Sequence, residues 1–444
     1  MISSDQNAIL TDVSPGAPMH VAMSRYWLPA LLSRDLPEAD SDPMRVTLLC
    51  RDFVAFRDTE GRVGILDEHC CHRSASLCLG RVEQGGIRCI YHGWKYDVNG
   101  AVLDMPNVSD DRIKARIRQG AYPVREAGGI IWVYLGPKDL EPPFPKHDFL
   151  DLPLDQTFVE IVVASTNYTR LLEGVLDSSH TGVLHADAIA AVSAGAGPAP
   201  VLGGHTRAAF GAAIAKNLAP RLEVEETDFG LRYAAIRDLE TPSGEASALA
   251  RVSTFALPAC VFTPPDNILL FAVPVSNDRT HFFMIYWDPE RTIGVGEALA
   301  ELRAYYGIDD VAMDYWGLDR KTHDLPDRPN RDNGWLQDRR RMRAGDSFTG
   351  LYRFIPEDFI VAMSMGPISG RPREHLVQAD LAIARYRRVL IDNALRIQAG
   401  EQPGGLVPRF RPRAIAGYVS PERPWTTLFD ENPALESVQA VETV

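Results

Sequence analysis

The sequence of 444 residues lacks long apolar runs, a leader peptide and a dense set of cysteines. A membrane-spanning helix needs about 18 or more consecutive apolar residues, and no such run occurs, so no membrane partner is expected. A secretory leader would begin with a basic region and an apolar core, which the first residues do not have. Six scattered cysteines do not make a disulfide framework. The sequence therefore predicts a protein of the reducing cytoplasm.

Basic residues and nucleotide-binding signatures are also scarce. Lysine and arginine number 46 against 59 acidic residues, and a net charge of −13 argues against nucleic acid as a partner. This balance still allows an anionic substrate in a local basic pocket. No Gly-x-Gly-x-x-Gly sequence follows a strand-like run, so no dinucleotide site is expected. A reaction that draws electrons from NAD(P)H would therefore need a separate protein.

Two short segments each carry a cysteine and a histidine. They are Cys70-x-His72 and, after sixteen intervening residues, Cys89-x-x-His92. Zinc sites usually draw close pairs of one ligand type, as in C-x-x-C, whereas a Rieske [2Fe-2S] cluster binds one iron through two cysteines and the other through two histidines. The mixed pairs favour the cluster, and a zinc site or simple packing stays the alternative. Such a cluster passes single electrons, because imidazole brings less negative charge to iron than thiolate.

Two further cysteines lie close to these ligands. Cys71 separates Cys70 from His72, and Cys78 lies in the intervening loop. Neither occupies a ligand spacing, so both are predicted to be packing thiols. Cys71 in place of Cys70 stays open as an alternative ligand.

The length favours two domains, because a single hydrophobic core stops growing well below this size. After a helical or irregular lead-in over residues 1–40, short apolar runs predict an all-β first domain over residues 1–150. The proline-rich stretch 141–145 is a plausible linker to a second domain over residues 151–444. There, strand-like runs between 221 and 287 predict an antiparallel sheet, and the segment 373–399 predicts a helix that covers one face.

The second domain begins with a strand and then a group of polar residues. These are Glu173, Asp177, His180 and His185. On a regular helix the first three share a face, whereas His185 lies about 140° round from His180. Both imidazoles could bind one metal only if the helix deforms or ends between them, and we expect this at Gly182. Spacing alone favours two partly exposed histidines over two ligands.

Two other stretches of the second domain have open interpretations. Residues 186–205 are rich in alanine and glycine, which predicts a flexible surface loop or, as the alternative, a mobile cover over a pocket. In the stretch 354–363, Glu357 and Asp358 lie where carboxylates complement the dipole of a helix that begins there.

The string Cys-Ile-Tyr-His-Gly-Trp-Lys-Tyr-Asp over 89–97 closely resembles the Rieske proteins of ring-hydroxylating oxygenases. The resemblance continues through 25–27, 121–125, 128–137 and 365–369, and so covers essentially the whole chain. Together these segments resemble the oxygenase (alpha) subunit of the phthalate dioxygenase branch, which also contains aromatic O-demethylases and N-dealkylases. The resemblance implies an α+β fold: an all-β Rieske [2Fe-2S] domain, then a helix-grip catalytic domain of antiparallel sheet plus long C-terminal helix.

The same resemblance implies two metal centres. The cluster would be held by the four ligands Cys70, His72, Cys89 and His92. A mononuclear Fe(II) would be held by His180, His185 and a carboxylate, because two histidines and one carboxylate leave positions open for O2 and substrate. The resemblance favours Asp358 as that carboxylate, with Glu357 as the alternative.

The resemblance also implies how the protein works. Asp177 would link a cluster histidine of one subunit to His180 of its neighbour in a homotrimer or a multiple of trimers. A separate reductase, and a ferredoxin where one is used, would deliver electrons for hydroxylation or O-demethylation of an aromatic substrate. An aromatic carboxylate fits this branch, and Arg207, Arg232, Arg237 and Arg251 are the candidates to bind it. The alternatives are N-dealkylation of a neutral aromatic compound, or a Rieske electron carrier without catalysis.

Overall fold

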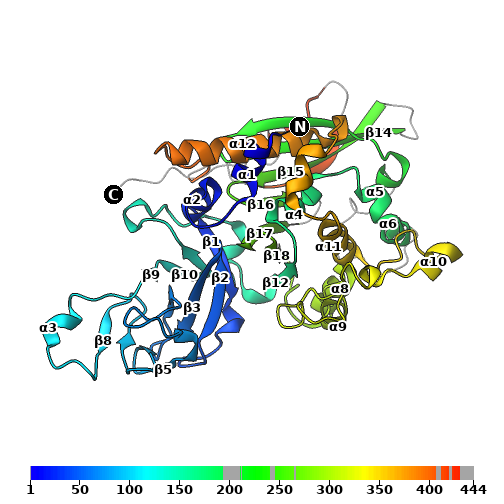
Figure 1. The fold of residues 1–444 in the computed structure, drawn as a ribbon. Helices are drawn as coiled ribbons and strands as arrows, with labels where there is room; N and C mark the ends of the chain where they lie inside the picture. The colour runs from blue at the N-terminus through cyan, green and yellow to red at the C-terminus, as the bar shows by residue number, and fades with distance from the viewer. Residues whose placement is uncertain are drawn as a thin grey trace.

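The computed structural model describes residues 2–193, 211, 213–240, 246–264, 267–406, 412–419 and 423–430. The chain starts with two short helices, α1 (Ser4–Thr11) and α2 (Pro18–Ser24). Three antiparallel sheets follow (Figure 1). Their strands, in spatial order, are β1 (Trp27–Leu32), β11 (Ile130–Tyr134) and β10 (Val124–Ala127); β2 (Met44–Leu48), β3 (Arg51–Arg57), β4 (Val63–Asp67) and β9 (Ala121–Tyr122); and β5 (Arg81–Glu83), β6 (Gly86–Arg88), β7 (Lys95–Tyr96) and β8 (Val102–Asp104).

Two of these sheets enclose a small hydrophobic core of their own. Phe56 of β3, Ile87 of β6 and Tyr96 of β7 are fully buried in it, together with Cys70 and Cys89. Bulky apolar side chains on alternate strand positions produce this packing, because neighbouring residues of a strand point to opposite faces. The candidate cluster cysteines are therefore part of a packed interior.

The third sheet packs on the second domain instead. Trp132 of β11 is fully buried and meets Phe271 edge to face, with ring centroids 6.3 Å apart. The buried side chains of this third sheet form one continuous core with those of the eight-stranded antiparallel sheet that follows. That sheet has the order β12 (Thr157–Ala164), β18 (Arg279–Trp287), β17 (Ile268–Ser276), β16 (Cys260–Thr263), β15 (Ala246–Ala256), β14 (Gly230–Glu240) and β13 (Arg221–Thr227), and β19 (Ile415–Val419) also pairs with β15.

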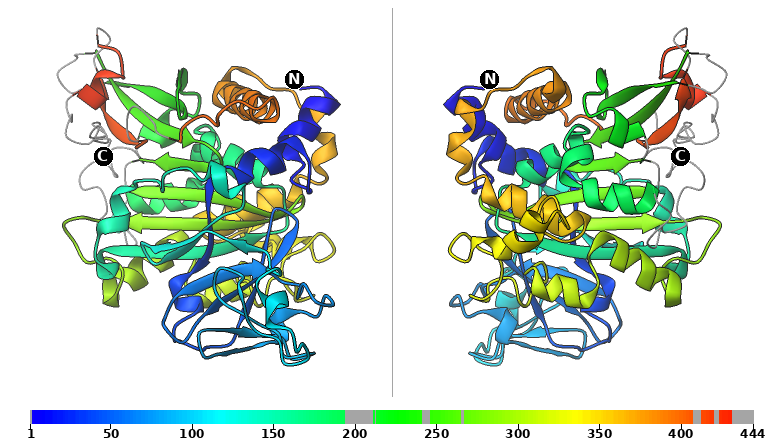
Figure 2. Two further views of the ribbon diagram at one scale, coloured as in Figure 1. Left: turned by 90° about the vertical axis from the view of Figure 1, so that its left-hand side faces the viewer. Right: turned by 90° about the vertical axis from the view of Figure 1, so that its right-hand side faces the viewer.

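A long helix, α12 (Leu381–Gln398), lies along the β13–β14 end of this sheet (Figures 1 and 2). Its buried side chains recur every three or four residues, at Tyr386, Leu390, Ala394 and Ile397, as an amphipathic helix requires. The predicted helix over 373–399 was wrong at its start. Residues Ile368–Arg373 form a 3₁₀ turn that contains Pro372, and regular helix begins only at Leu381.

Two shorter helices on the large sheet carry the site. The first, α4 (Tyr168–Leu176), packs on β16 and β17, and α11 (Phe354–Ser364) packs on α4. The remaining helices are α3 (Asp111–Lys114), α5 (Thr181–Leu184), α6 (Ala186–Ser193), α8 (Gly296–Tyr306), α9 (Asp310–Tyr315), α10 (Arg339–Ala344) and α13 (Thr427–Asp430). None of the described helices is long and apolar enough to cross a membrane.

The alanine-rich stretch 186–205 begins as a helix, so the predicted loop was wrong for its first part. Residues Ala186–Ser193 form α6. Alanine has the highest helix propensity, and the residues that oppose a helix, glycine and proline, come only further along this stretch. Residues 194–205 lie outside the described part, so a loop or cover there stays a prediction.

Candidate active site

The segment that carries both candidate iron histidines is two helices with a turn between them. Helix α4 ends at Leu176, and Asp177 leaves it in an extended conformation, with φ −94° and ψ 111°. The Asp177 carboxylate accepts hydrogen bonds from the backbone N and hydroxyl of Ser179 at 2.7 and 2.6 Å, which fixes the turn. His180 then caps α5.

This turn corrects two expectations about the segment. The helix ends at Asp177 and not at Gly182, because Gly182 lies inside α5. There an added Cβ would lie 2.5 Å from the Leu218 side chain, so close packing accounts for this glycine. Glu173 does not share a face with His180. Its buried carboxylate turns away to form ion pairs with two arginines.

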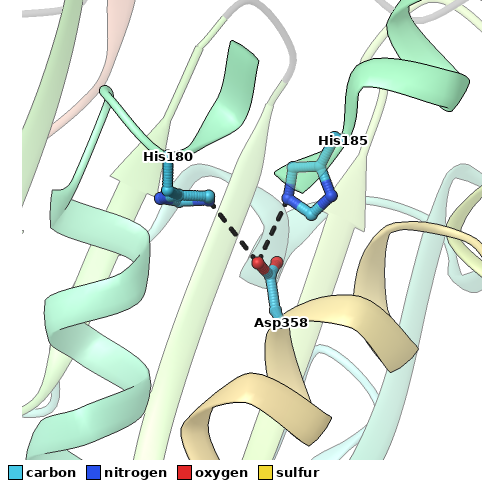
Figure 3. Close-up of side chains that lie close together, drawn as sticks. All are labelled: His180, His185 and Asp358. Atoms are coloured by element: carbon cyan, nitrogen blue, oxygen red, sulfur yellow. Dashed lines mark ion pairs between the residues drawn. The ribbon is translucent and has the colours of Figure 1, made fainter. Parts of the chain in front are cut away.

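The turn brings His180 and His185 onto one side, facing Asp358 of α11 (Figure 3). Asp358 Oδ1 lies 3.5 Å from His180 Nε2 and 3.1 Å from His185 Nε2. One ligand atom from each residue lies within 4.8 Å of the others, close enough to share one metal ion. The structure thus assembles the three residues that the sequence proposed as iron ligands.

Glu357, the alternative ligand, lies on the other side of the His185 ring. Its Oε2 is 2.8 Å from His185 Nδ1, whereas Asp358 approaches Nε2. Adjacent residues of a helix point about 100° apart, so one of the two carboxylates faces the triad and the other lies beside it. The geometry favours Asp358 as the ligand.

The charges around the triad suit a divalent cation. Burial alone would lower the pKa of His185, but Asp358 and Glu357 raise it to about 9. Burial raises the pKa of Asp358, yet His185 and His180 bring it below its ordinary value. The site therefore stabilises positive charge between the imidazoles, which a metal ion held by the two Nε2 atoms would supply. Two imidazoles and a carboxylate are a donor set that Fe(II) accepts.

The four candidate cluster ligands lie on two facing loops. Cys70 follows β4 and Cys89 follows β6, and each side chain is only 2% exposed. The imidazoles of His72 and His92 are partly exposed, and their ring centroids are 4.5 Å apart. His92 Nδ1 is buried with no hydrogen-bond partner among the described residues, as expected of a nitrogen that faces a metal cluster.

Two neighbours of this cluster site were not predicted as functional. Trp94 stacks on His72 with ring centroids 4.3 Å apart, and the Tyr96 hydroxyl lies 3.0 Å from Cys70 Sγ. Both belong to the string that carried the family resemblance, but ligand spacing gives them no role. Cys71 was expected to pack inside and is instead exposed, whereas Cys78 packs against the small core.

A cavity of about 210 Å³ adjoins the iron triad. Its walls come from α8, α11 and the centre of the large sheet, and they are mostly apolar or aromatic. Among the lining residues are Ile268, Leu270, Tyr286, Tyr305, Tyr306 and Phe354. Among the described lining residues, the cationic one is Arg251 on β15. This composition suits an aromatic molecule with one anionic group.

The other candidate arginines differ in position. Arg237 is buried and donates from Nη2 to the Ser178 carbonyl, 2.9 Å away. Burial, together with the charge of Arg251, lowers the pKa of Arg237 to about 10. Arg232 lies over the Phe429 ring, 4.0 Å from its centroid, and does not line the cavity. Arg207 lies outside the described residues.

Comparison with known proteins gives the class. Residues 26–120 match the model of the Rieske [2Fe-2S] domain, and residues 133–443 match the family described as LigXa C-terminal domain like. A Rieske domain joined to such a catalytic domain defines an iron-dependent oxygenase.

Relatives along the whole chain specify the family. The oxygenase subunit of phthalate 4,5-dioxygenase from Pseudomonas putida is 34% identical, over 94% of this chain and 92% of that protein. The oxygenase subunit of 3-chlorobenzoate-3,4-dioxygenase from Comamonas testosteroni is 34% identical, over 97% and 98%. The crystal structure of dicamba monooxygenase bound to 3,6-dichlorosalicylic acid has the same fold, with a TM-score of 0.55 at 18% identity over 85% of this chain and 99% of that one.

The chain belongs to the Rieske non-haem iron aromatic oxygenases, as an oxygenase subunit. This confirms the predicted family, α+β fold class, enzyme class and pair of iron cofactors, a [2Fe-2S] cluster and a mononuclear iron. The assignment of individual ligands stays a prediction.

Proposed function

We propose that this subunit hydroxylates or O-demethylates an aromatic carboxylate, using O2 and electrons from a separate NAD(P)H-dependent reductase, directly or through a ferredoxin. The position and charge of Arg251 are the observation that favours a carboxylate as the substrate. Arg251 lines the cavity beside the triad and donates hydrogen bonds to the hydroxyls of Ser178 and Ser253, at 3.3 and 3.1 Å. Among the described residues no carboxylate neutralises it, so a substrate carboxylate could accept two parallel hydrogen bonds from its guanidinium.

Different residues around the cavity would contact different parts of the substrate. Arg251 would fix the carboxylate at one end, and aromatic side chains such as Tyr305 and Phe354 would pack against the ring and exclude water. His180, His185 and Asp358 form the wall at which oxidation takes place. The carbon that this arrangement holds nearest the triad would decide between ring hydroxylation and demethylation.

We assign the metal ligands as the sequence indicated. In residues 1–150, Cys70, His72, Cys89 and His92 hold the cluster; in residues 151–444, His180, His185 and Asp358 hold the iron. When bound, the cluster supplies single electrons and the iron activates O2. The buried orphan nitrogen of His92 and the converging atoms of the triad support this assignment.

We further propose a homotrimer, or a multiple of trimers, in which Asp177 links the cluster of one copy to the triad of the next. In a single chain, Figures 1 and 2 place the β5–β8 sheet at the end away from α5 and α11. Asp177 is 22% exposed, and its Oδ2 lies 3.5 Å from His180 Nδ1, so it can orient His180 and still meet another subunit. A monomer that turns over substrate would contradict this proposal.

We also propose a cytoplasmic location, because none of the six cysteines forms a disulfide bond.

The two alternative functions, N-dealkylation and electron transfer without catalysis, would each leave part of the structure without a role. A neutral N-alkylated aromatic substrate would leave the charge of Arg251 without a partner. A pure electron carrier would need only the first domain and would have no use for the triad of His180, His185 and Asp358. The geometry therefore favours an oxygenase for aromatic acids.

Substrate binding to anaerobic, reduced protein tests the substrate class and requires no reductase. A panel of benzoic, phthalic and methoxybenzoic acids is compared by calorimetry with the matching amides, in the parent and in Arg251→Gln. We expect the parent to prefer an acid, and Arg251→Gln to lose at least tenfold in affinity for that acid, about 1.4 kcal/mol, with no change for its amide. Equal binding of acids and amides by the parent would favour a neutral substrate.

A further inference from the structure

Glu357 has contacts that neither a metal ligand nor a helix-capping residue would need. It lies in the first turn of α11, one residue before Asp358, and its side chain is 4% exposed. Its Oε2 is 2.8 Å from Nδ1 of the buried His185, and its Oε1 accepts a 2.6 Å hydrogen bond from the Thr349 hydroxyl. Both oxygens of the carboxylate are thus used inside the protein.

These contacts determine which nitrogen of His185 can bind a metal. An ionised carboxylate is only an acceptor, so His185 Nδ1 must carry the proton that it donates to Glu357. The lone pair of His185 is then on Nε2, the nitrogen 3.1 Å from Asp358 Oδ1. A metal-binding imidazole held by a carboxylate in this way has a fixed tautomer and orientation and a more basic ligand nitrogen.

The Thr349 hydroxyl that donates to Glu357 is itself held by a second hydrogen bond. The Thr349 hydroxyl accepts a hydrogen bond from the backbone N of Leu351 at 3.1 Å, so its proton is free to point at Glu357. Asp187, two residues after His185, accepts hydrogen bonds from the Ser347 hydroxyl and the Phe348 backbone N at 2.8 and 3.0 Å. The loop before α11 is therefore tied to the helix that follows His185.

The two candidate iron histidines are consequently supported in different ways. His180 is 23% exposed and lies 3.5 Å from a carboxylate, Asp177, that is also partly exposed. His185 and Glu357 are 3% and 4% exposed and form a bond of 2.8 Å. In the proposed trimer Asp177 could also meet the neighbouring subunit, whereas both oxygens of Glu357 are already bonded within the chain.

We propose that Glu357 is a positioning residue that fixes His185 as an Nε2 ligand and sets how tightly the iron is held. This inference rests on the proposed iron site. It assigns the retention of iron to the buried pair of Glu357 and His185, and leaves contact with the neighbouring subunit to Asp177 and His180.

Glu357→Gln is the variant that isolates the charge of this residue. The amide can keep its oxygen on His185 and turn its NH2 toward Thr349, whose hydroxyl can accept, so the shape of the site is retained. Loss of such a supporting partner typically costs about 10-fold to 100-fold in metal affinity. We expect that loss in a competition between anaerobic protein and an Fe(II) chelator, and a smaller loss in Thr349→Val, which keeps the charge but removes the hydroxyl.

A change in stability alone would not account for this result. Glu160→Gln is the matched control, because the Glu160 side chain is a largely buried acid paired with Arg34 and does not line the cavity beside the triad. It should lower the melting temperature and leave the iron affinity unchanged. The visible spectrum of the cluster reports in every variant whether the first domain is intact, and the EPR signal of a nitric oxide adduct reports the surroundings of the mononuclear iron.

These experiments distinguish a failure of the proposed role of Glu357 from a failure of the proposed iron site. Iron affinity in Glu357→Gln within twofold of the parent, with an unchanged nitric oxide signal, would overturn the role of Glu357 alone. A parent protein that binds no iron beyond its cluster would overturn the proposed iron site.

Discussion

At the scale of single residues, the candidate cluster site has a hydroxyl beside it that lies outside the predicted ligand set. Tyr96 is fully buried, and its Oη lies 3.0 Å from Cys70 Sγ. Burial raises the pKa of Tyr96 above its ordinary value, so the hydroxyl stays protonated and can donate to the thiolate. Hydrogen bonds to cluster sulfurs are among the factors that set the reduction potential.

Tyr96→Phe is expected to lower the reduction potential of the cluster. The hydrogen bond stabilises the more negative, reduced state, and the variant loses it. A shift on the order of 60 mV corresponds to a tenfold change for a one-electron couple, and a potentiometric titration followed by EPR measures it. Tyr122→Phe serves as the matched control, because the Tyr122 hydroxyl donates to Asp67 Oδ1 at 2.8 Å and not to a candidate cluster ligand. An unchanged potential in Tyr96→Phe would show that the hydroxyl does not act on the cluster.

At the scale of elements, helix α4 is held in place by a buried charge network. Glu173 accepts hydrogen bonds from Arg387 Nε at 2.8 Å and from Arg371 Nη2 at 3.0 Å. Both arginines come from the segment Ile368–Gln398, more than 190 residues along the chain. The network fixes the helix end from which Asp177 and His180 project.

Glu173→Gln is expected to destabilise the second domain strongly. Removal of one member of a buried ion pair costs about 3–5 kcal/mol, because the remaining charges stay buried without a partner. Glu226→Gln is a matched control, since its pair with Arg385 of the same helix α12 is 49% and 45% exposed. That variant should cost less than about 1 kcal/mol. Thermal unfolding measures both, and equal melting temperatures for the two variants would contradict this account of α4.

The sequence predicted the local parts of this architecture well. The candidate cluster ligands lie on two short loops, where spacing is informative, and strands such as β11 and β12 follow from apolar runs. The break after α4 was misplaced at Gly182 because a glycine is the usual signal, whereas the turn is made by the Asp177 side chain and Ser179. The run Asp177-Ser178-Ser179 is typical of such a turn, but it was not used in the prediction.

Contacts between distant segments were harder to predict. Asp358 could be joined to His180 and His185 only through the family resemblance, because the partners lie more than 170 residues apart in the sequence. Strand β16 has only four residues, Cys260–Thr263, and β19 pairs with β15 from the far end of the chain. The runs predicted as strands in this region were 221–226, 231–237, 250–255, 267–273 and 281–287, so both segments were missed. Pairing with neighbours, and not local composition, makes such segments strands.

At the scale of the whole molecule, the two candidate metal sites belong to separate parts of one chain. The cluster ligands lie between two small sheets with their own core, and the triad lies over the large sheet. Loss of one site should therefore leave the other intact. The proposed trimer would bring the two kinds of site together between copies, with Asp177 at the contact.

Metal and sulfide analysis under anaerobic conditions tests the central claim, that the chain holds a cluster and a separate mononuclear iron. The parent and His180→Ala are compared, with visible spectra and with light scattering to give the number of chains. We expect three irons and two sulfides per chain in a trimer or its multiple, since the cluster would hold two of each and the triad one iron. In His180→Ala we expect two irons and an unchanged cluster spectrum. Two irons in both proteins would contradict the mononuclear site and leave an electron carrier with an unexplained second domain.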